Sequence, residues 1–123
     1  MAIAACGRAS GLLALRFFAE DVVNVTAERE KTLTINEIYH SIQGESTWVG
    51  QPCVFVRLTF CNLRCNYCDT EHAFYEGKKQ TLNDIVDTVA GFRCPLVEIT
   101  GGEPLLQKNV LPFMSRSLRA SPP

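Results

Sequence analysis

The sequence predicts an α/β fold built on parallel strands. Three patterns carry this prediction: a nearly continuous apolar run at residues 52–60, an amphipathic stripe at residues 81–90 and a second short apolar run at residues 96–100. Nearly continuous apolar character is typical of a strand that is covered on both faces. A strand, a helix and a further strand in this order form a right-handed unit whose two strands run parallel.

The composition is that of an ordinary globular chain, and it excludes several functions. Of 123 residues, 46% are hydrophobic and 20% are charged, with 12 Lys and Arg against 13 Asp and Glu. The net charge of −1 excludes a groove that binds nucleic acid through bulk positive charge, so we expect no nucleic-acid partner. Arginines interrupt the apolar runs before they reach the roughly 18 residues of a membrane span, so we expect no membrane association.

Residues 1–31 differ from the rest of the chain and are predicted to be a poorly defined N-terminal extension. Their apolar stretch, residues 11–18, is short and contains Arg16, whereas a secretory signal has a longer uninterrupted apolar region. The segment also holds more acidic residues than a transit peptide would. Cys6 has no spacing relation to the other cysteines, and we assign it no role. Residues 32–123 are expected to form the folded domain.

Two strand-like segments precede a group of cysteines. Residues 33–39 alternate loosely and are expected to form a short strand, which runs into a polar, glycine-centred loop at residues 41–46. Residues 52–60 are rich in β-branched and aromatic residues, and the cysteines follow them at once. The cysteine loop is therefore expected to leave the end of a strand.

The helices are assigned from their termini as well as from their periodicity. The amphipathic stripe should begin after Thr81, because Thr81 and Asp84 form the pattern of a capping box, and should end near Gly91. A last helix is expected over residues 109–118. Pro112 would lie in its first turn, where proline is tolerated.

Two motifs follow the two strands of the predicted parallel pair. Three clustered cysteines follow residues 52–60, and Gly101-Gly102-Glu103-Pro104 follows residues 96–100. Both motifs should therefore lie at the carboxyl ends of adjacent parallel strands, where α/β folds bind ligands. We expect them to converge on one site.

The chain contains six cysteines, of which Cys61, Cys65 and Cys68 lie within eight residues in the spacing C-x3-C-x2-C. A disulfide framework spreads its cysteines along the chain, so this clustering argues against one. Clustered thiols in a chain of ordinary composition favour a metal or cluster site in the reducing cytoplasm, which is the expected location. Cys53 and Cys94 are expected to be small buried hydrophobic residues.

Two kinds of metal site are compatible with this spacing. A tetrahedral zinc site needs four ligands, and His72 is the nearby residue that could supply the fourth. A cubane iron–sulfur cluster normally takes four thiolates, so three thiolates would leave one iron free to bind a substrate or a cofactor. Glu37, His40 and His72 are otherwise expected to be solvated or structural.

Together the two motifs resemble those of the radical S-adenosylmethionine superfamily. The cysteine motif carries an aromatic residue, Tyr67, before its third cysteine, and Gly-Gly-Glu-Pro follows after a strand. The resemblance implies that Cys61, Cys65 and Cys68 hold a [4Fe-4S] cluster whose open iron binds S-adenosylmethionine. One electron from the cluster would cleave this cofactor to a radical that abstracts a substrate hydrogen. The residues that the resemblance places at the cofactor are Tyr67, Asp69, Gly101, Gly102 and Glu103.

The resemblance also implies a fold, the N-terminal part of a partial (βα)6 barrel that is truncated after its second βα unit. Residues 32–123 would be the N-terminal half of a radical S-adenosylmethionine core domain. Members of the superfamily continue through further strands that complete the partial barrel. We therefore expect this chain to be a fragment that is unstable or inactive in isolation.

The flanking residues resemble one family within the superfamily, the 7-carboxy-7-deazaguanine synthases. The similarity is carried by Ser41-Ile42-Gln43-Gly44-Glu45, by Phe55-Val56-Arg57-Leu58 and by Cys68-Asp69-Thr70. It implies a carbon–nitrogen lyase that converts 6-carboxy-5,6,7,8-tetrahydropterin to 7-carboxy-7-deazaguanine and releases ammonia, in queuosine biosynthesis. No side chain is expected to be catalytic, because the cofactor carries the radical.

This family resemblance also implies sites for the substrate and magnesium, and it implies partners. Arg57 would pair with the substrate carboxylate, and Thr70 would bind Mg2+. A flavodoxin-type protein would donate the electron, and the full-length enzyme would be a homodimer. The residues implied to contact the pterin are Ile42, Gln43, Gly44, Arg57 and Thr100.

Other interpretations of these residues stay open at this point. Arg57 could be a surface charge near a strand end, Thr70 a turn hydroxyl, and residues 43–45 an ordinary loop. Ser46 stands where the family's loop has glycine, which changes the backbone freedom of that loop. The functional alternatives are a glycyl-radical activase of the same superfamily and a non-catalytic metal-binding fragment.

Overall fold

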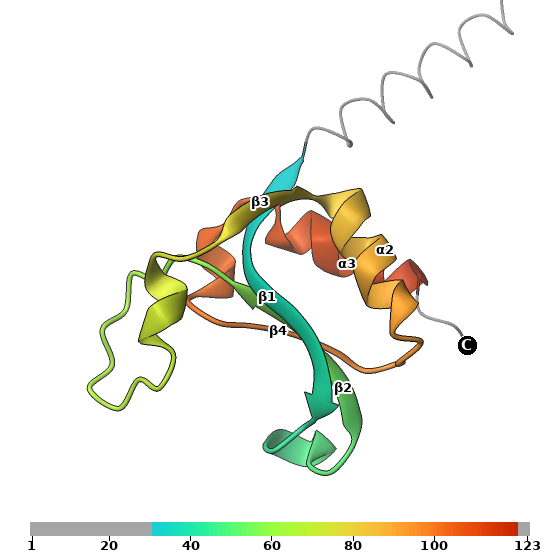
Figure 1. Ribbon diagram of the computed structural model, residues 1–123, viewed down its shortest axis with the longest axis horizontal. Helices are drawn as coiled ribbons and strands as arrows, with labels where there is room; N and C mark the ends of the chain where they lie inside the picture. The colour runs from blue at the N-terminus through green and yellow to red at the C-terminus, as the bar shows by residue number, and fades with distance from the viewer. Residues whose placement is uncertain (1–30, 121–123) are drawn as a thin grey trace, which may run out of the picture. The chain divides into compact units, whose positions relative to one another are not determined.

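The computed structural model describes residues 31–120, and their side chains as far as residue 117 (Figure 1). The extension predicted over residues 1–31, including Cys6, lies outside the described residues except for Lys31. The described residues form a four-stranded sheet in the order β3-β1-β2-β4. Its strands are β1 (Thr32–Ile42), β2 (Pro52–Leu58), β3 (Lys78–Thr81) and β4 (Val97–Thr100).

Two α-helices accompany this sheet, α2 (Leu82–Gly91) and α3 (Val110–Ala120). Short 3-10 turns, η1 (Ser46–Trp48), η2 (Glu71–Phe74) and η3 (Pro104–Leu106), lie in the loops. No helix within residues 31–120 is long and apolar enough to cross a membrane. The fold is therefore mixed α/β, as the sequence predicts.

The parallel pair at the centre of the prediction is confirmed. β2 runs parallel to β4, with Val54 opposite Val97 and Arg57 opposite Thr100. Both strands therefore end at the same edge of the sheet, and the cysteine loop and the Gly-Gly-Glu-Pro loop leave from that edge. This pairing puts the two motifs where ligands bind in α/β folds.

The rest of the sheet is antiparallel and differs from the sequence prediction. β1 pairs antiparallel with β2 and, on its other side, with β3. β1 is also longer than the predicted strand at residues 33–39. β3 reads Lys-Lys-Gln-Thr, and this polar composition is typical of an edge strand that pairs on one side only. Its formation depends on β1 as a partner, which local periodicity does not reveal.

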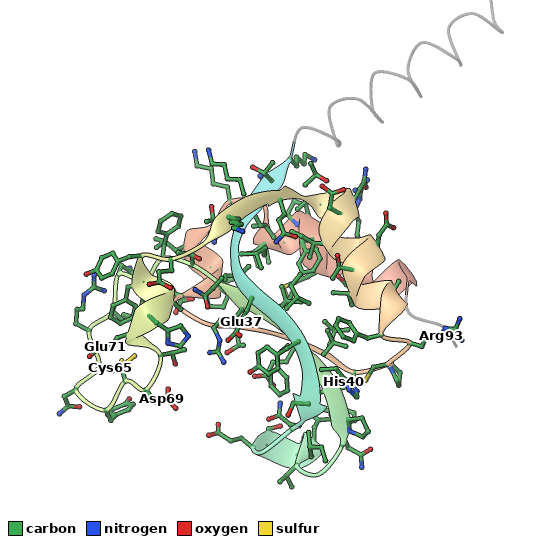
Figure 2. All side chains as sticks on the ribbon, viewed as in Figure 1. Glu37, His40, Cys65, Asp69, Glu71 and Arg93 are labelled. Carbon is green, nitrogen blue, oxygen red and sulfur yellow. The ribbon has the colours of Figure 1, made fainter. Side chains whose placement is uncertain are left out.

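The helix termini follow the predicted capping in part. The Thr81 hydroxyl accepts a hydrogen bond from the backbone N–H of Asp84 at 3.2 Å, which confirms the predicted N-cap of α2. α2 ends at Gly91, but the positive φ that closes the turn belongs to Arg93, at 51°. Pro112 lies in the first turn of α3, as predicted. Figure 2 labels Arg93 just beyond the end of α2.

The hydrophobic core lies between one face of the sheet and the two helices, which contact each other (Figure 1). α2 contributes Leu82, Ile85 and Val89, and α3 contributes Val110 and Phe113. All of these side chains are buried. The strand residues of the same core are Leu33, Ile35, Val54, Val56 and Leu58.

A β-bulge in β1 decides which of its side chains reach this core. Ile35 pairs with Leu58 and Glu37 pairs with Arg57, so Asn36 is one extra residue on β1. Side chains alternate along a strand, and the extra residue shifts this alternation by one position. Ile35 and Ile38 therefore both pack on the helix side, whereas Glu37 faces the opposite side of the sheet.

The face of the sheet opposite the helices carries a row of mainly polar side chains, which we call the polar face. It follows from the register that aligns Glu37 with Arg57, Tyr39 with Phe55, and Arg57 with Thr100. Glu98 is on the same side of β4 as Thr100, because the two are separated by one residue. The polar face consists of Glu37, Tyr39, Gln43, Arg57, Glu98 and Thr100.

Candidate functional site

The cysteine loop leaves β2 through Thr59 and Phe60. Cys65 is exposed, and Cys61 and Cys68 are partly buried. All three are free thiols, as are Cys53 and Cys94. The backbone N–H of Cys68 donates to the carbonyl oxygen of Cys65 at 3.2 Å and forms a turn. Figure 2 labels Cys65 on this loop, with Asp69 and Glu71 after it, away from α2 and α3.

The donor atoms of this loop fit an iron–sulfur cluster better than a site for a hard cation. The eight residues from Cys61 to Cys68 contain three thiols and no carboxylate. Thiolates are the preferred ligands of iron–sulfur clusters. Within residues 31–117, no three Cys, His, Asp or Glu side chains are arranged around a common point. The match to an iron–sulfur cluster therefore rests on the three thiol donors and on their position in one loop.

Arg64 is the charged residue inside the cysteine loop, and the loop itself holds its side chain. One guanidinium nitrogen, Nη1, donates to the carbonyl oxygens of Cys61 at 2.8 Å and Leu63 at 2.5 Å. The guanidinium carbon lies 4.6 Å from the centre of the Phe74 ring, a cation–π contact. Arg64 thus connects the first half of the loop to η2.

The Gly-Gly-Glu-Pro loop leaves β4 with two residues in the left-handed region. Gly101 has a φ of 74° and Gly102 has a φ of 47°. A Cβ atom on Gly102 would collide with the carbonyl oxygen of Phe60, and one on Gly101 would collide with the side chain of Arg57. Glycine is therefore required at both positions, where the backbone passes close to β2 and the residues after it.

Phe60 joins the two motifs. It adopts a φ of 76°, which is unusual for a residue other than glycine. Its N–H donates to the carbonyl oxygen of Ala73 at 3.0 Å, beyond the cysteines, and its carbonyl oxygen accepts from the N–H of Glu103 at 2.8 Å. The beginning of the cysteine loop, η2 and the Gly-Gly-Glu-Pro loop are thus connected through one residue. The predicted convergence of the two motifs is confirmed.

Arg57 is held at the centre of the polar face. Its Nε donates to Oε1 of Glu37 at 2.8 Å, and its Nη2 donates to the hydroxyl of Tyr39 at 2.9 Å. The Tyr39 ring in turn stacks on Phe55 at a centroid distance of 5.1 Å. Burial by itself lowers the pKa of Arg57, but Glu37 and Tyr39 outweigh it, and the net shift is upward. Arg57 is therefore a fixed, partly buried cation.

Asp69 and Thr70 follow the last cysteine and lie within electrostatic range of Arg57. The Thr70 hydroxyl donates to Oδ1 of Asp69 at 2.7 Å. This hydrogen bond is the main cause that lowers the pKa of Asp69, and the charge of Arg57 lowers it further. Arg57 on the polar face therefore acts electrostatically on the end of the cysteine loop.

Gln43 and Gly44 follow β1, at the end of the polar face. The Gln43 side chain is 6% exposed; its Nε2 donates to Oε2 of Glu98, and its Oε1 accepts from the N–H of Glu45 at 3.1 Å. A Cβ atom on Gly44 would meet nothing within 4 Å. Ser46 adopts a φ of 63°, so the position where the family pattern has glycine does need the left-handed conformation.

Some predicted site residues are not drawn into this arrangement. The side chains of Tyr67 and Ile42 are 85% and 65% exposed. Thr100, by contrast, is part of the polar face: it is aligned with Arg57 across β2 and β4 and is partly buried. Cys53 and Cys94 are buried, as predicted. Burial raises the pKa of the Cys53 thiol, and the nearby charge of Glu98 raises it further.

The sequence prediction missed three residues of this site. Glu37 was expected to be solvated or structural; its ion pair with Arg57 is compatible with a structural role but was not foreseen. Tyr39 and Glu98 were not singled out, and both bond to residues that were. A signal for Glu98 existed, because it shares the side of its strand with Thr100. No such signal existed for Glu37, since the bulge at Asn36 changes its side.

Comparison with known proteins identifies similar proteins. The family model of the Radical SAM superfamily matches residues 55–120, which is more than half of the chain. The 7-carboxy-7-deazaguanine synthase of Koribacter versatilis (strain Ellin345) is 54% identical over 86 residues, or 68% of this chain and 38% of that protein. The protein of the same name from Thermoplasma acidophilum is 45% identical over 82 residues, or 67% of this chain and 39% of that protein.

A solved structure shares the fold. The crystal structure of QueE from Escherichia coli superposes with a TM-score of 0.71 at 24% sequence identity, over 80% of this chain and 52% of that chain. The chain spans about two fifths of the length of the curated relatives it matches. The matched segment includes both the cysteine motif and the Gly-Gly-Glu-Pro loop. On this evidence the chain belongs to the radical SAM superfamily.

Proposed function

We propose that the protein acts as a 7-carboxy-7-deazaguanine synthase and converts 6-carboxy-5,6,7,8-tetrahydropterin to 7-carboxy-7-deazaguanine with release of ammonia, on the route to queuosine. The relatives that carry this name, at 45% and 54% identity, support the proposal. So does the hydrogen bond through Phe60, which unites the two motifs of the superfamily at one sheet edge. That hydrogen bond is the structural observation on which the proposal depends most.

The proposal includes the architecture of the whole domain. The four-stranded sheet would be the N-terminal part of a partial (βα)6 barrel, with the polar face turned toward the barrel interior. The shared fold with QueE supports this arrangement, as does the parallel pairing of β2 with β4. In such barrels the interior at the carboxyl ends of the strands holds the ligands.

Cys61, Cys65 and Cys68 would hold a [4Fe-4S] cluster, and S-adenosylmethionine would bind beside it. When bound, these groups supply the radical chemistry. The chain's own part is positioning: Gly101 and Gly102 let the backbone approach the cofactor closely, and Glu103 is fixed by its bond to Phe60. Tyr67 and Asp69 would flank the cofactor from the cysteine loop.

The polar face would bind the pterin. Arg57 would meet the substrate carboxylate, because a fixed guanidinium suits a planar anion. Gln43, with Ile42 and Gly44, would contact the ring from the end of β1, and Thr100 would contact it from β4. The ordered Gln43 amide and the open space beside Gly44 support this placement.

Thr70 would be a ligand of Mg2+ at the same site. Its hydroxyl donates to the Asp69 carboxylate at 2.7 Å, and Asp69 is a charged oxygen donor next to it. Magnesium keeps few protein ligands and takes the rest from substrate oxygens and water. A cation here would be suited to organise the substrate carboxylate and ring.

The proposal extends to the partners that the family resemblance implies. A flavodoxin-type protein would donate the electron, and the exposure of Cys65 leaves the cysteine loop accessible to such a donor. The enzyme would be a homodimer.

Anaerobic reconstitution of the full chain with iron and sulfide tests the function. The reconstituted protein is incubated with S-adenosylmethionine, dithionite and 6-carboxy-5,6,7,8-tetrahydropterin, and the products are separated by chromatography. Formation of both 5′-deoxyadenosine and 7-carboxy-7-deazaguanine supports the proposal and contradicts the expectation that this chain is inactive in isolation. 5′-Deoxyadenosine without the deazapurine contradicts the substrate, and bound zinc without iron contradicts the enzyme.

A further inference from the structure

The guanidinium of Arg57 has two edges, and the polar face occupies one of them. Nε donates to Oε1 of Glu37 at 2.8 Å, and Nη2 donates to the hydroxyl of Tyr39 at 2.9 Å. Arginine has five N–H donors in a fixed planar arrangement. Two of the five are thus used, one on Nε and one on Nη2, the two nitrogens that border the lateral edge.

The second edge of the guanidinium lies at its end and is formed by N–H groups of Nη1 and Nη2. Nη1 has no hydrogen-bond partner among the side chains and backbone of residues 31–117. One N–H of Nη1 and the second N–H of Nη2 point the same way, along the end of the planar group. Two parallel N–H groups match the two oxygens of a carboxylate. The end edge of Arg57 is therefore suited to bind a carboxylate in a bidentate manner.

Both partners of Arg57 are fixed by the sheet. Glu37 lies directly opposite Arg57 in the register of β1 and β2, and the bulge at Asn36 turns it toward the polar face. Tyr39 stacks on Phe55, and the Arg57 guanidinium lies 5.7 Å from the centre of the Tyr39 ring. Figure 2 shows Glu37 beside the middle of β1, away from the helices.

Glu37 could affect a bound carboxylate in two ways, and these predict opposite effects of removing its charge. If Glu37 acted on the substrate only through its charge, it would repel a carboxylate, and its removal would tighten binding. If it acts by orienting Arg57, its removal would weaken binding, because the guanidinium would lose its fixed direction. The hydrogen bond at 2.8 Å and the matching bond from Tyr39 favour orientation.

We infer that Glu37 and Tyr39 are positioning residues that present the end edge of Arg57 for bidentate binding of a substrate carboxylate. This inference rests on the proposed function, which assigns the carboxylate to Arg57. It adds that specificity for a carboxylated pterin comes from three side chains on two strands.

The test compares two ligands on the reconstituted full chain with S-adenosylmethionine present. Anaerobic calorimetry gives the Kd of 6-carboxy-5,6,7,8-tetrahydropterin and of tetrahydropterin without the carboxylate. In Glu37→Ala and Tyr39→Phe we expect the preference for the carboxylated ligand to fall by roughly tenfold, the effect of losing one hydrogen bond to a charged group. Glu37→Gln, which keeps an acceptor for Nε, should retain most of the preference.

A matched control removes an exposed carboxylate on the helix side of the sheet. Asp87 is exposed on α2, and Asp87→Ala should leave the ligand preference unchanged. Thermal unfolding of each variant shows that the fold is retained, and Tyr39→Phe provides the test if Glu37→Ala does not fold.

The outcomes are distinguishable. An unchanged preference in Glu37→Ala and Tyr39→Phe overturns the positioning role and leaves the proposed function intact, and so does tighter binding of the carboxylated ligand by Glu37→Ala. If the unaltered chain shows no preference for the carboxylated ligand, the role of Arg57 in the proposed function is wrong, and the inference falls with it.

Discussion

The backbone N–H of Glu103 donates to the carbonyl oxygen of Phe60 at 2.8 Å and connects two loops that are far apart in the sequence. One loop follows β2 and holds the three clustered cysteines; the other follows β4 and holds the two glycines. A cluster and a cofactor that bind to these loops would have their separation set by this contact. Changes at this junction should therefore affect the two binding events together.

Gly102→Ala should disrupt this junction. Its Cβ would collide with the Phe60 carbonyl oxygen, and the φ of 47° is unfavourable for alanine. Strain of about 1–3 kcal/mol at the loop would weaken S-adenosylmethionine binding by roughly tenfold or more. Calorimetry on the reconstituted protein measures this loss.

The matched control is Gly91→Ala, at the end of α2. A Cβ atom there meets nothing within 4 Å, and the position is helical. We expect unchanged cofactor affinity and a stability gain of about 0.5–1 kcal/mol. Equal losses in both variants would show that the junction has no special role.

Cys65→Ala should prevent cluster assembly. Three thiolates are the fewest that would hold a cubane with one open iron, and the loop offers no carboxylate to replace a lost sulfur. Iron and sulfide analysis, with the visible absorbance of the reconstituted protein, measures the loss. Cys53→Ala, which removes a buried thiol away from the loop, should keep the iron content. A Cys65→Ala protein with full iron and sulfide would contradict the ligand assignment.

Gln107→Leu should destabilise the fold without touching the site. The Gln107 amide accepts from the N–H of Thr34 at 2.8 Å and donates to the carbonyl oxygens of Thr34 and Thr59, each at 2.9 Å. Leucine would leave the Thr34 N–H and the Thr59 carbonyl without the bonds that Gln107 makes to them, at a cost of about 2–4 kcal/mol, whereas the Thr34 carbonyl would still accept from the N–H of Thr59. Urea denaturation measures the change. Lys108→Gln, one exposed residue further on, should change stability by less than about 0.5 kcal/mol.

The pKa of Asp69 should depend on Thr70. The Thr70 hydroxyl is the main cause of the lowered pKa, so Thr70→Ala should raise the pKa of Asp69 toward its ordinary value. Arg57→Gln should raise it less, because the Arg57 charge contributes less. Carboxyl NMR titration follows both changes.

The sign of the accompanying pH effect follows from the direction of this shift. Because the folded-state pKa of Asp69 lies below its ordinary value, any stabilisation from this group is present above the ordinary pKa. It is lost as the pH falls through the lowered value. Thr70→Ala should therefore reduce the stability difference between neutral and acidic pH, and an unchanged difference would contradict the coupling.

The sequence predicted the parts of this molecule that depend on local patterns. The apolar run of β2, the cap at Thr81 and the spacing of Cys61, Cys65 and Cys68 are all readable over a few residues, and parallel pairing followed from element order. These patterns were sufficient to bring the two motifs to one sheet edge.

The remaining parts depend on contacts between distant residues. The strand β3 is polar and forms because β1 is beside it, and the positive φ of Phe60 is held by Ala73 and Glu103. Gln107 bonds to a strand more than seventy residues earlier. The local sequence around these residues gives no pattern that predicts these long-range contacts.

Asn36 reverses which face of the sheet the odd-numbered side chains of β1 point to. Before it, the odd-numbered residues Leu33 and Ile35 face the helices; after it, the odd-numbered residues Glu37 and Tyr39 face the other way. The odd-numbered residues in the first half of the strand must therefore fit the core, whereas those in the second half are on the polar face. Substitutions at odd positions before Asn36 should change stability, whereas substitutions at odd positions after it should change ligand binding. The residues of the binding surface can therefore vary without any change in core packing.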